Sequence, residues 1–209
     1  MAMENQIRAI LFDLGGVLVE LSGIPTLLSW IGNRMTPEEL WVTWLSSSVV
    51  RSFETGQLHP EVFAERLIEE LALPVAAEEF LREFTYWPKR LFPGALQLVQ
   101  RIPPRYVRAT LCNTNALHWP RLMDDMKLAT VFDRHFASHL INRIKPDEDA
   151  FQHVIEALGY PASEVLFLDD NKLNVDAAKM IGMKAVQVKG IGEAQKALLE
   201  AGIIGTNPA

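Results

Sequence analysis

The chain lacks most of the features that mark extracellular, membrane or nucleic-acid-binding proteins. It holds one cysteine, Cys112, among 209 residues, which excludes an internal disulfide framework and a thiolate metal cage. It has no dense basic run, and 20 lysines and arginines against 26 aspartates and glutamates give a formal net charge of −6. This balance disfavours a general binder of nucleic acid or anionic membranes.

Long apolar runs are also missing, and no stretch is long enough to span a bilayer. The first residues lack the charged and apolar regions of a signal peptide. We therefore expect a cytoplasmic protein without membrane integration, whose partner is a small molecule. The sequence leaves the oligomeric state open.

What is present is an ordinary globular composition, 49% hydrophobic and 22% charged. Apolar runs predict five strands, and helical patterns alternate with the later four. The alternation predicts an α/β fold with a doubly wound parallel sheet in the order 3-2-1-4-5, its first strand at the centre. The predicted strands are 8–12, 106–111, 135–138, 165–168 and 185–188; the predicted helices are 94–101, 119–127, 147–158, 175–181 and 193–199.

A long interruption between the first and second strands, residues 21–91, has helical periodicity throughout. Thr36, Pro37 and Glu39 form a helix start with a capping box, and the helix is expected to continue through Val49. Two more helices are predicted over 60–71 and 77–84. We interpret the segment as an inserted helical domain, with 1–20 and 92–209 forming the α/β core, and we expect the tail after Gly202 to be frayed.

Four tryptophans of this segment are interpreted mainly as its apolar core. One or two of them remain candidates to line a substrate pocket. They are Trp30, Trp41, Trp44 and Trp87.

Polar residues follow the predicted strands at the points where the strands end. Asp13 ends the first strand and is followed by Gly15 and Gly16. Each such residue alone is also typical of a turn or helix cap. In a doubly wound sheet, however, these ends meet in one crevice. The other clusters are 112–115, 143–146 and 169–171.

Together these residues indicate magnesium-assisted phosphoryl transfer. Carboxylates such as Asp13 and Asp170 suit Mg²⁺, which usually keeps waters and substrate phosphate as further ligands. An aspartate can attack phosphorus, and a lysine such as Lys145 screens the phosphoryl oxygens. Backbone N–H groups at a loop and helix start bind the remaining oxygens.

The motifs resemble those of the haloacid dehalogenase-like (HAD) superfamily, and the match covers nearly the whole chain. The resemblance is closest to a phosphatase branch similar to α-D-glucose-1-phosphate phosphatase, and it implies that residues 21–91 are a helical cap. The matching segments are 13–17 for the first motif, 111–115 for the second, 145–151 for the third and 167–170, continued by 174–178, for the fourth.

The resemblance implies a Mg²⁺-dependent phosphatase that acts on a small phosphorylated metabolite through an aspartyl-phosphate. Asp13 would be the nucleophile, and Lys145 would hold the transferring group. The metal ligands implied are Asp13, the Gly15 carbonyl and Asp170, with Asp169 orienting them. The phosphate-binding residues implied are Gly15, Gly16, Cys112, Asn113, Thr114 and Lys145.

Two positions depart from the family pattern. The second aspartate of the first motif, which protonates the leaving group and then activates water, is Gly15 here. Its loss typically costs about 10²- to 10⁴-fold in rate, so we expect a slow or substrate-restricted enzyme. Cys112 replaces a phosphate-binding hydroxyl, and a thiol is a poorer donor; Thr114 is a candidate to compensate.

Other functions stay open. Gly15 and Cys112 are also consistent with a non-catalytic relative that binds a phosphorylated ligand or a protein partner. A haloacid dehalogenase would use the same nucleophile without metal, but paired carboxylates at 169–170 argue against it. Glu54 and His59 of the insert are candidates for a substitute acid, although a solvated turn between helices is the favoured interpretation.

Overall fold

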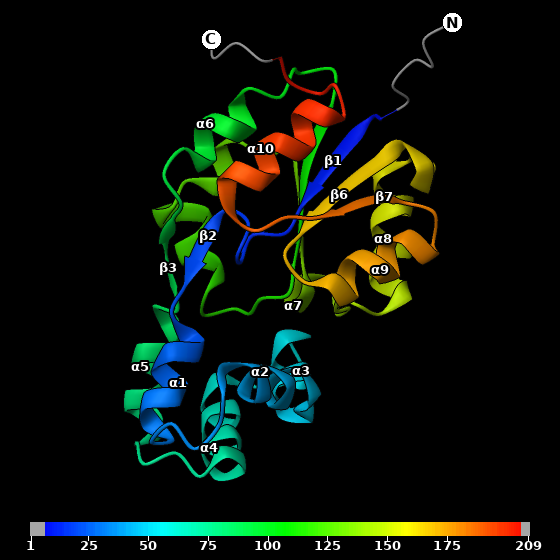
Figure 1. Cartoon of the computed structure of the whole chain (residues 1–209). Helices are drawn as coiled ribbons and strands as arrows, with labels where there is room; N and C mark the ends of the chain where they lie inside the picture. The colour runs from blue at the N-terminus through cyan, green and yellow to red at the C-terminus, as the bar shows by residue number, and fades with distance from the viewer. Residues whose placement is uncertain (1–6, 206–209) are drawn as a thin grey trace, which may run out of the picture.

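Five parallel strands form the central sheet of the computed structural model, which describes residues 7–205 (Figure 1). Their order is β5-β4-β1-β6-β7, which is the predicted 3-2-1-4-5, and each predicted strand end is within one residue of the observed one. The strands are β1 (Ala9–Phe12), β4 (Val107–Cys112), β5 (Arg134–Ala137), β6 (Val165–Asp169) and β7 (Lys184–Gln187).

The sheet is covered on both faces, so its strands are apolar throughout. Along β1, Ile10 and Phe12 pack with α6 (Ala95–Gln100) and α10 (Gly190–Glu200). The alternate residues of β1 face α8 (Glu148–Leu158) and α9 (Lys172–Met180). These two pairs of helices lie on opposite sides of the sheet in Figure 1.

These four helices confirm four of the predicted ones, with α9 starting three residues early because the Asn171 side chain accepts a hydrogen bond from the Leu173 N–H. The α-helix expected over 119–127 is instead a π-helix, η1 (Arg121–Asp125). Short helical turns complete the α/β part of the chain: η2 (Leu128–Thr130), α7 (Ser138–Ile141) and η3 (Ala162–Glu164).

The prediction of a frayed tail is wrong for Ile203 and Ile204, whose side chains are buried in the same apolar cluster as α6 and α10. The burial of two isoleucines stabilises a segment that has no regular periodicity to reveal it. The rest of the predicted tail, residues 206–209, lies outside the described residues.

Five helices lie between β2 (Val19–Leu21) and β3 (Pro88–Leu91), within the segment predicted to be inserted. The predicted capping box is confirmed, since the Thr36 hydroxyl accepts from the Glu39 N–H and the Glu39 carboxylate accepts from the Thr36 N–H. The helix expected to reach Val49 ends at Ser46, because Ser47 is extended and its hydroxyl caps the next helix. The helices are α1 (Gly23–Trp30), α2 (Pro37–Ser46), α3 (Ser48–Glu54), α4 (Pro60–Leu71) and α5 (Ala77–Thr85).

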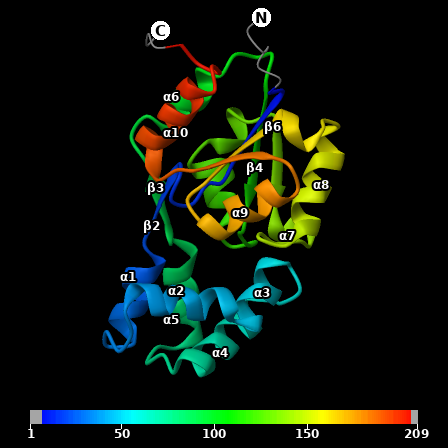
Figure 2. The same cartoon turned by 45° about the vertical axis from the view of Figure 1, so that its right-hand side comes forward.

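An antiparallel pair of strands that the sequence analysis missed connects these helices to the sheet. β2 pairs with β3, and Glu20 binds Lys89 and Arg90 across the pair at 2.8 and 2.7 Å. The helices have their own apolar cluster, in which the rings of Phe53 and Phe63 stack with their centroids 4.0 Å apart. Figures 1 and 2 show them facing the carboxyl ends of the sheet strands. No helix within 7–205 is both long and apolar enough to cross a membrane.

Candidate active site

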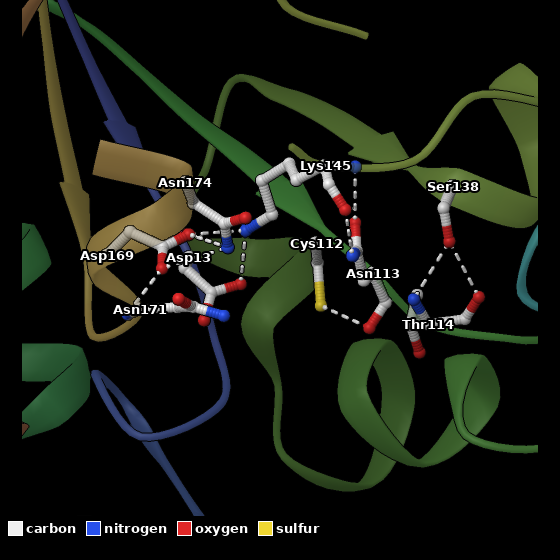
Figure 3. Close-up of polar contacts among 9 residues, drawn as sticks. All are labelled: Asp13, Cys112, Asn113, Thr114, Ser138, Lys145, Asp169, Asn171 and Asn174. Atoms are coloured by element: carbon white, nitrogen blue, oxygen red, sulfur yellow. Dashed lines mark hydrogen bonds and ion pairs between the residues drawn. The ribbon is translucent and has the colours of Figure 1, made fainter. Parts of the chain in front are cut away.

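A buried lysine joins the carboxyl ends of two neighbouring strands. The Lys145 ammonium, on the loop before α8, donates to Asp13 Oδ1 at 2.8 Å and to Asp169 Oδ2 at 2.7 Å (Figure 3). The Asn113 side chain holds the backbone of Lys145 by two hydrogen bonds of 2.9 Å. Four segments far apart in the sequence therefore meet here, as the strand-end argument predicts.

Asp169 is completely buried, and its carboxylate is fully used inside the protein. Besides Lys145, it accepts hydrogen bonds from the Asn171 N–H at 2.8 Å and from the Asn174 amide at 3.0 and 3.1 Å. Asp169 thus fixes the position of the lysine. The sequence analysis assigned no such contact to Asn174, although its place one turn after the acidic pair was a signal.

The charges of the site shift the pKa values of its members. Burial raises the pKa of Asp13 to about 7, against the attraction of Lys145, and the neighbouring Asp169 and Asp170 raise it further. Burial and Asp169 raise the pKa of Asp170 to about 6. Burial would lower the pKa of Lys145, but the two carboxylates it contacts raise it above its ordinary value.

The carboxylates form a group suited to a divalent cation. Asp13, Asp169 and Asp170 each offer an oxygen, and these oxygens lie within 4.8 Å of one another. Since Asp169 is occupied by hydrogen bonds, Asp13 and the less buried Asp170 are the two available ligands. Burial is the main cause of their raised pKa values, and repulsion between the carboxylates adds to it; a bound cation would relieve this repulsion.

The two glycines after Asp13 have different roles. Gly15 lines the cavity above Asp13. Gly16 is absent from that lining, and its N–H donates to the Val19 carbonyl at 2.9 Å. Gly16 has φ +68°, and a Cβ there would lie 2.2 Å from Asp170 Oδ2, so the residue makes room for that carboxylate.

Cys112 ends β4, Thr114 follows it two residues later, and both line the cavity with Lys145. Burial and the Asp13 charge raise the pKa of the Cys112 thiol well above its usual value, so it stays protonated. The Thr114 N–H donates to the Ser138 hydroxyl, which in turn donates to the Thr114 carbonyl (Figure 3). The Thr114 hydroxyl is buried without a hydrogen-bond partner among the described residues, and the residue lines the cavity. Ser138, which follows β5, was missed by the sequence analysis.

A family model for haloacid dehalogenase-like hydrolases matches residues 7–182. The chain belongs to this family. The sequence is 28% identical to the sesquiterpene phosphatase astK of Aspergillus oryzae, over 87% of this chain and 89% of that protein. It is 26% identical to a phosphoglycolate phosphatase of Pseudomonas savastanoi, over 86% of this chain and 68% of that protein.

Solved structures share the fold of this haloacid dehalogenase-like hydrolase. HAD family enzyme bt-2542 of Bacteroides thetaiotaomicron, in complex with magnesium and inorganic phosphate, has a TM-score of 0.71 at 24% identity and covers 88% of this chain and 94% of its own. A HAD-like hydrolase of Porphyromonas gingivalis has a TM-score of 0.75 at 24% identity, with 93% and 97% covered.

The hydrolase has a cavity of about 360 Å³ between the strand ends and the inserted helices. Asp13, Lys145 and Asp170 line its sheet side, and Glu54, the last residue of α3, lines the opposite side. His59 lies outside this lining, with an 89% exposed side chain. Of the two candidate acids, only Glu54 therefore reaches the cavity.

Three tryptophans of the insert and one histidine line the cavity. Trp44 and Trp87 are buried in the apolar cluster of the insert and also line the cavity, whereas Trp41 lines it while 39% exposed. His118 lines the cavity, but its Nε2 lies 2.7 Å from the Phe84 carbonyl and burial lowers its pKa to about 4. A neutral imidazole bound to α5 is a structural link between insert and core.

Proposed function

We propose that this hydrolase is a Mg²⁺-dependent phosphatase that forms an aspartyl-phosphate on Asp13. The observation that carries the proposal is the Asp13–Lys145–Asp169 arrangement with Asp170 beside it, which combines a nucleophile, a fixed cation and a pair of metal-binding carboxylates. Two relatives described above are named phosphatases, and the structural neighbour bt-2542 was crystallised with magnesium and phosphate.

In this proposal an Asp13 oxygen attacks phosphorus. The Lys145 ammonium, held by Asp169, attracts the phosphoryl oxygens and orients the nucleophile. Asn113 positions the lysine backbone, and the free Thr114 hydroxyl is placed to donate to a phosphoryl oxygen in place of the thiol of Cys112.

Asp13, Asp170 and the Gly15 carbonyl would hold Mg²⁺, with Asp169 supporting them. When bound, Mg²⁺ neutralises charge on the transferring phosphoryl group. Gly16 would contribute by leaving space for Asp170 rather than by donating its N–H, which Val19 already accepts. The helices of 21–91 would form a cap domain over the core built from 1–20 and 92–209.

Phosphate release from a panel of small monophosphates tests the function, run with Mg²⁺ and with chelator. We expect release only with Mg²⁺, and loss of turnover in Asp13→Asn with the fold intact by circular dichroism. Asp124→Asn, at an exposed position, is the matched control. Turnover by Asp13→Asn, or halide release that resists the chelator, would contradict the proposal.

A further inference from the structure

The cavity has two chemically different sides. Its sheet side carries the charges described above. The insert supplies mainly apolar side chains, and Leu173 of α9 completes the mouth. The principal apolar lining residues are Trp41, Trp44, Leu45, Val50, Trp87 and Leu173.

The charged groups on the insert side already have partners, whereas the Trp87 indole N–H has none among the described residues. Arg51 and Glu54 are the charged residues that the insert contributes to the lining. Arg51 forms an ion pair with Asp147 of the core. Glu54 has its pKa raised to about 7 by burial, and an indole hydrogen bond from Trp44 and the nearby Lys145 oppose the rise. A substrate rich in hydroxyl groups would lose water here and find fewer hydrogen-bond partners than hydroxyl groups, which is costly.

Exposed apolar side chains also gather at the mouth of the cavity. Trp41 is 39% exposed, Leu45 42% and Leu173 59%. They come from two helices on opposite sides of the opening, α2 and α9. A hydrocarbon group placed between them would remove apolar surface from water on both sides.

We infer that the phosphatase acts on the monophosphate of an apolar aliphatic alcohol, whose hydrocarbon part lies between α2 and α9. This inference rests on the proposed function, since the charged side of the cavity must bind the phosphate. The insert then selects substrates by burying their carbon chain.

Hexyl phosphate and sorbitol 6-phosphate test this inference, because both are six-carbon primary esters that differ in hydroxyl content. We expect kcat/KM for hexyl phosphate to be at least about a hundredfold higher. From butyl to hexyl phosphate, kcat/KM should rise by up to about fourfold for each added methylene group. Equal or better turnover of sorbitol 6-phosphate overturns the inference and leaves the phosphatase standing. No release from any monophosphate overturns both.

One leucine and one valine of α2 provide a matched pair of variants. Leu45 lines the cavity, whereas Val42 is 65% exposed and does not. Leu45→Asp should lower kcat/KM for hexyl phosphate at least about tenfold and reduce the preference over sorbitol 6-phosphate. Val42→Asp should change neither, and equal effects of the two variants would contradict the inference.

A separate observation concerns the end of α3, where residues on both sides of Glu54 contact the α/β part of the chain. Before it, Arg51 pairs with Asp147. After it, the Asn142 amide donates to the Thr55 carbonyl at 2.9 Å, and a Cβ at Gly56 would lie 2.7 Å from the His139 carbonyl. Figures 1 and 2 show α3 beside α7.

These contacts hold the end of α3, and with it Glu54, at the cavity that Gly15 also lines without a side chain. Glu54, Gly15 and Asp13 line the same cavity. The groups that interact electrostatically with Glu54 are the Lys145 ammonium and the Cys112 thiol, and the adjacent Arg51 is neutralised by Asp147. We expect a phosphate bound at Asp13 to extend its leaving group toward the insert side of this cavity, which Glu54 lines.

We propose that Glu54 is the proton donor that replaces the missing aspartate at position 15. As the bond between an Asp13 oxygen and phosphorus forms, the bond between phosphorus and the ester oxygen breaks. The ester oxygen keeps the electron pair and takes the proton of Glu54, which releases the alcohol. The Glu54 carboxylate then accepts a proton from water, whose oxygen attacks phosphorus. The bond between phosphorus and the Asp13 oxygen breaks, and phosphate leaves. Asp13 is again a carboxylate and Glu54 is again protonated.

Leaving-group dependence tests this role. Glu54→Gln should lower kcat for hexyl phosphate about 10²-fold or more, and for 2,4-dinitrophenyl phosphate less than about fivefold, because a phenolate needs no proton. Glu61→Gln, exposed on α4, is the control and should change neither. The Glu54→Gln/Gly15→Asp double variant should recover part of the alkyl activity. Equal losses on both esters, or none, would overturn the proposal, with thermal melting used to verify folding.

Discussion

A β-carbon at Gly16 would lie 2.2 Å from Oδ2 of Asp170, while a β-carbon at Gly15 would meet only the end of the Leu21 side chain, at 2.9 Å. The first contact cannot be accommodated without moving a carboxylate of the candidate metal site. The second requires a small shift of a flexible side chain, and Gly15 does not have the left-handed backbone of Gly16. The two neighbouring glycines therefore differ in what they allow.

We predict that Gly16→Ala abolishes most activity and weakens Mg²⁺ binding at least tenfold. The left-handed backbone costs about 1–2 kcal/mol for alanine, and Asp170 must move in addition. The measurements are phosphate release and the Mg²⁺-induced rise in melting temperature. Gly159→Ala is the control, because Gly159 has φ +71° with no atom within 4 Å of a Cβ. It should lose stability similarly while binding Mg²⁺ normally.

A second prediction concerns the buried ammonium of Lys145. Lys145→Met leaves Asp13 and Asp169 without their shared cation, and removing one partner from a buried ion pair costs about 3–5 kcal/mol of unfolding free energy. Urea unfolding at pH 8 measures this loss. The loss of unfolding free energy should be smaller at pH 5, where Asp13, whose pKa is raised to about 7, is protonated more readily. Lys172→Met, whose lysine pairs with Asp176 at the surface, should change the unfolding free energy by less than about 1 kcal/mol.

The sheet and its strand ends were predictable because they depend on local patterns. Apolar runs mark buried strands, and parallel connections bring Asp13, Lys145 and Asp169 together whatever the detailed packing. The β2–β3 pair was not predictable, because its strands are short and one starts at Pro88. The helix break at Ser47 was also missed, since helical periodicity continues across it.

The contacts of the site depend on partners far apart in the chain. The hydrogen bonds between Ser138 and Thr114 join residues that are 24 positions apart and have no sequence signature. Asn174, five positions after Asp169, was the exception, because its place one turn after the acidic pair was a signal. The most consequential miss is Glu54, which the polar segment around it suggested to be solvated. Glu54 is half-buried at the cavity, where the neighbouring residues Arg51 and Thr55 contact the 142–147 segment, and local sequence does not encode these contacts.

Cys112 gives a third prediction. A buried thiol with a raised pKa is a poor nucleophile, so a thiol-specific reagent such as a disulfide probe should label the native protein at least a hundredfold more slowly than the urea-unfolded protein. Labelling that is fast and abolishes turnover would indicate an accessible thiolate. Cys112→Ser should retain turnover and lower KM by providing a stronger donor.

The last prediction is a pH dependence of stability that originates at Glu54. Its pKa is about 7 in the folded protein against an ordinary value of 4.5, so between these values the folded state binds more protons than the unfolded state. The contribution of Glu54 to the unfolding free energy is therefore fully present below pH 4.5. It is lost as pH rises through 7, and the loss has an upper limit of about 3 kcal/mol. Asp13, with its pKa raised to about 7, adds a loss of the same sign. Glu54→Gln should remove only the first part, so its unfolding free energy should fall less than that of the unaltered protein between pH 4.5 and 8, both without Mg²⁺. Urea titrations at several pH values measure the two curves, and parallel curves would mean that Glu54 ionises as freely in the folded protein as in the unfolded chain.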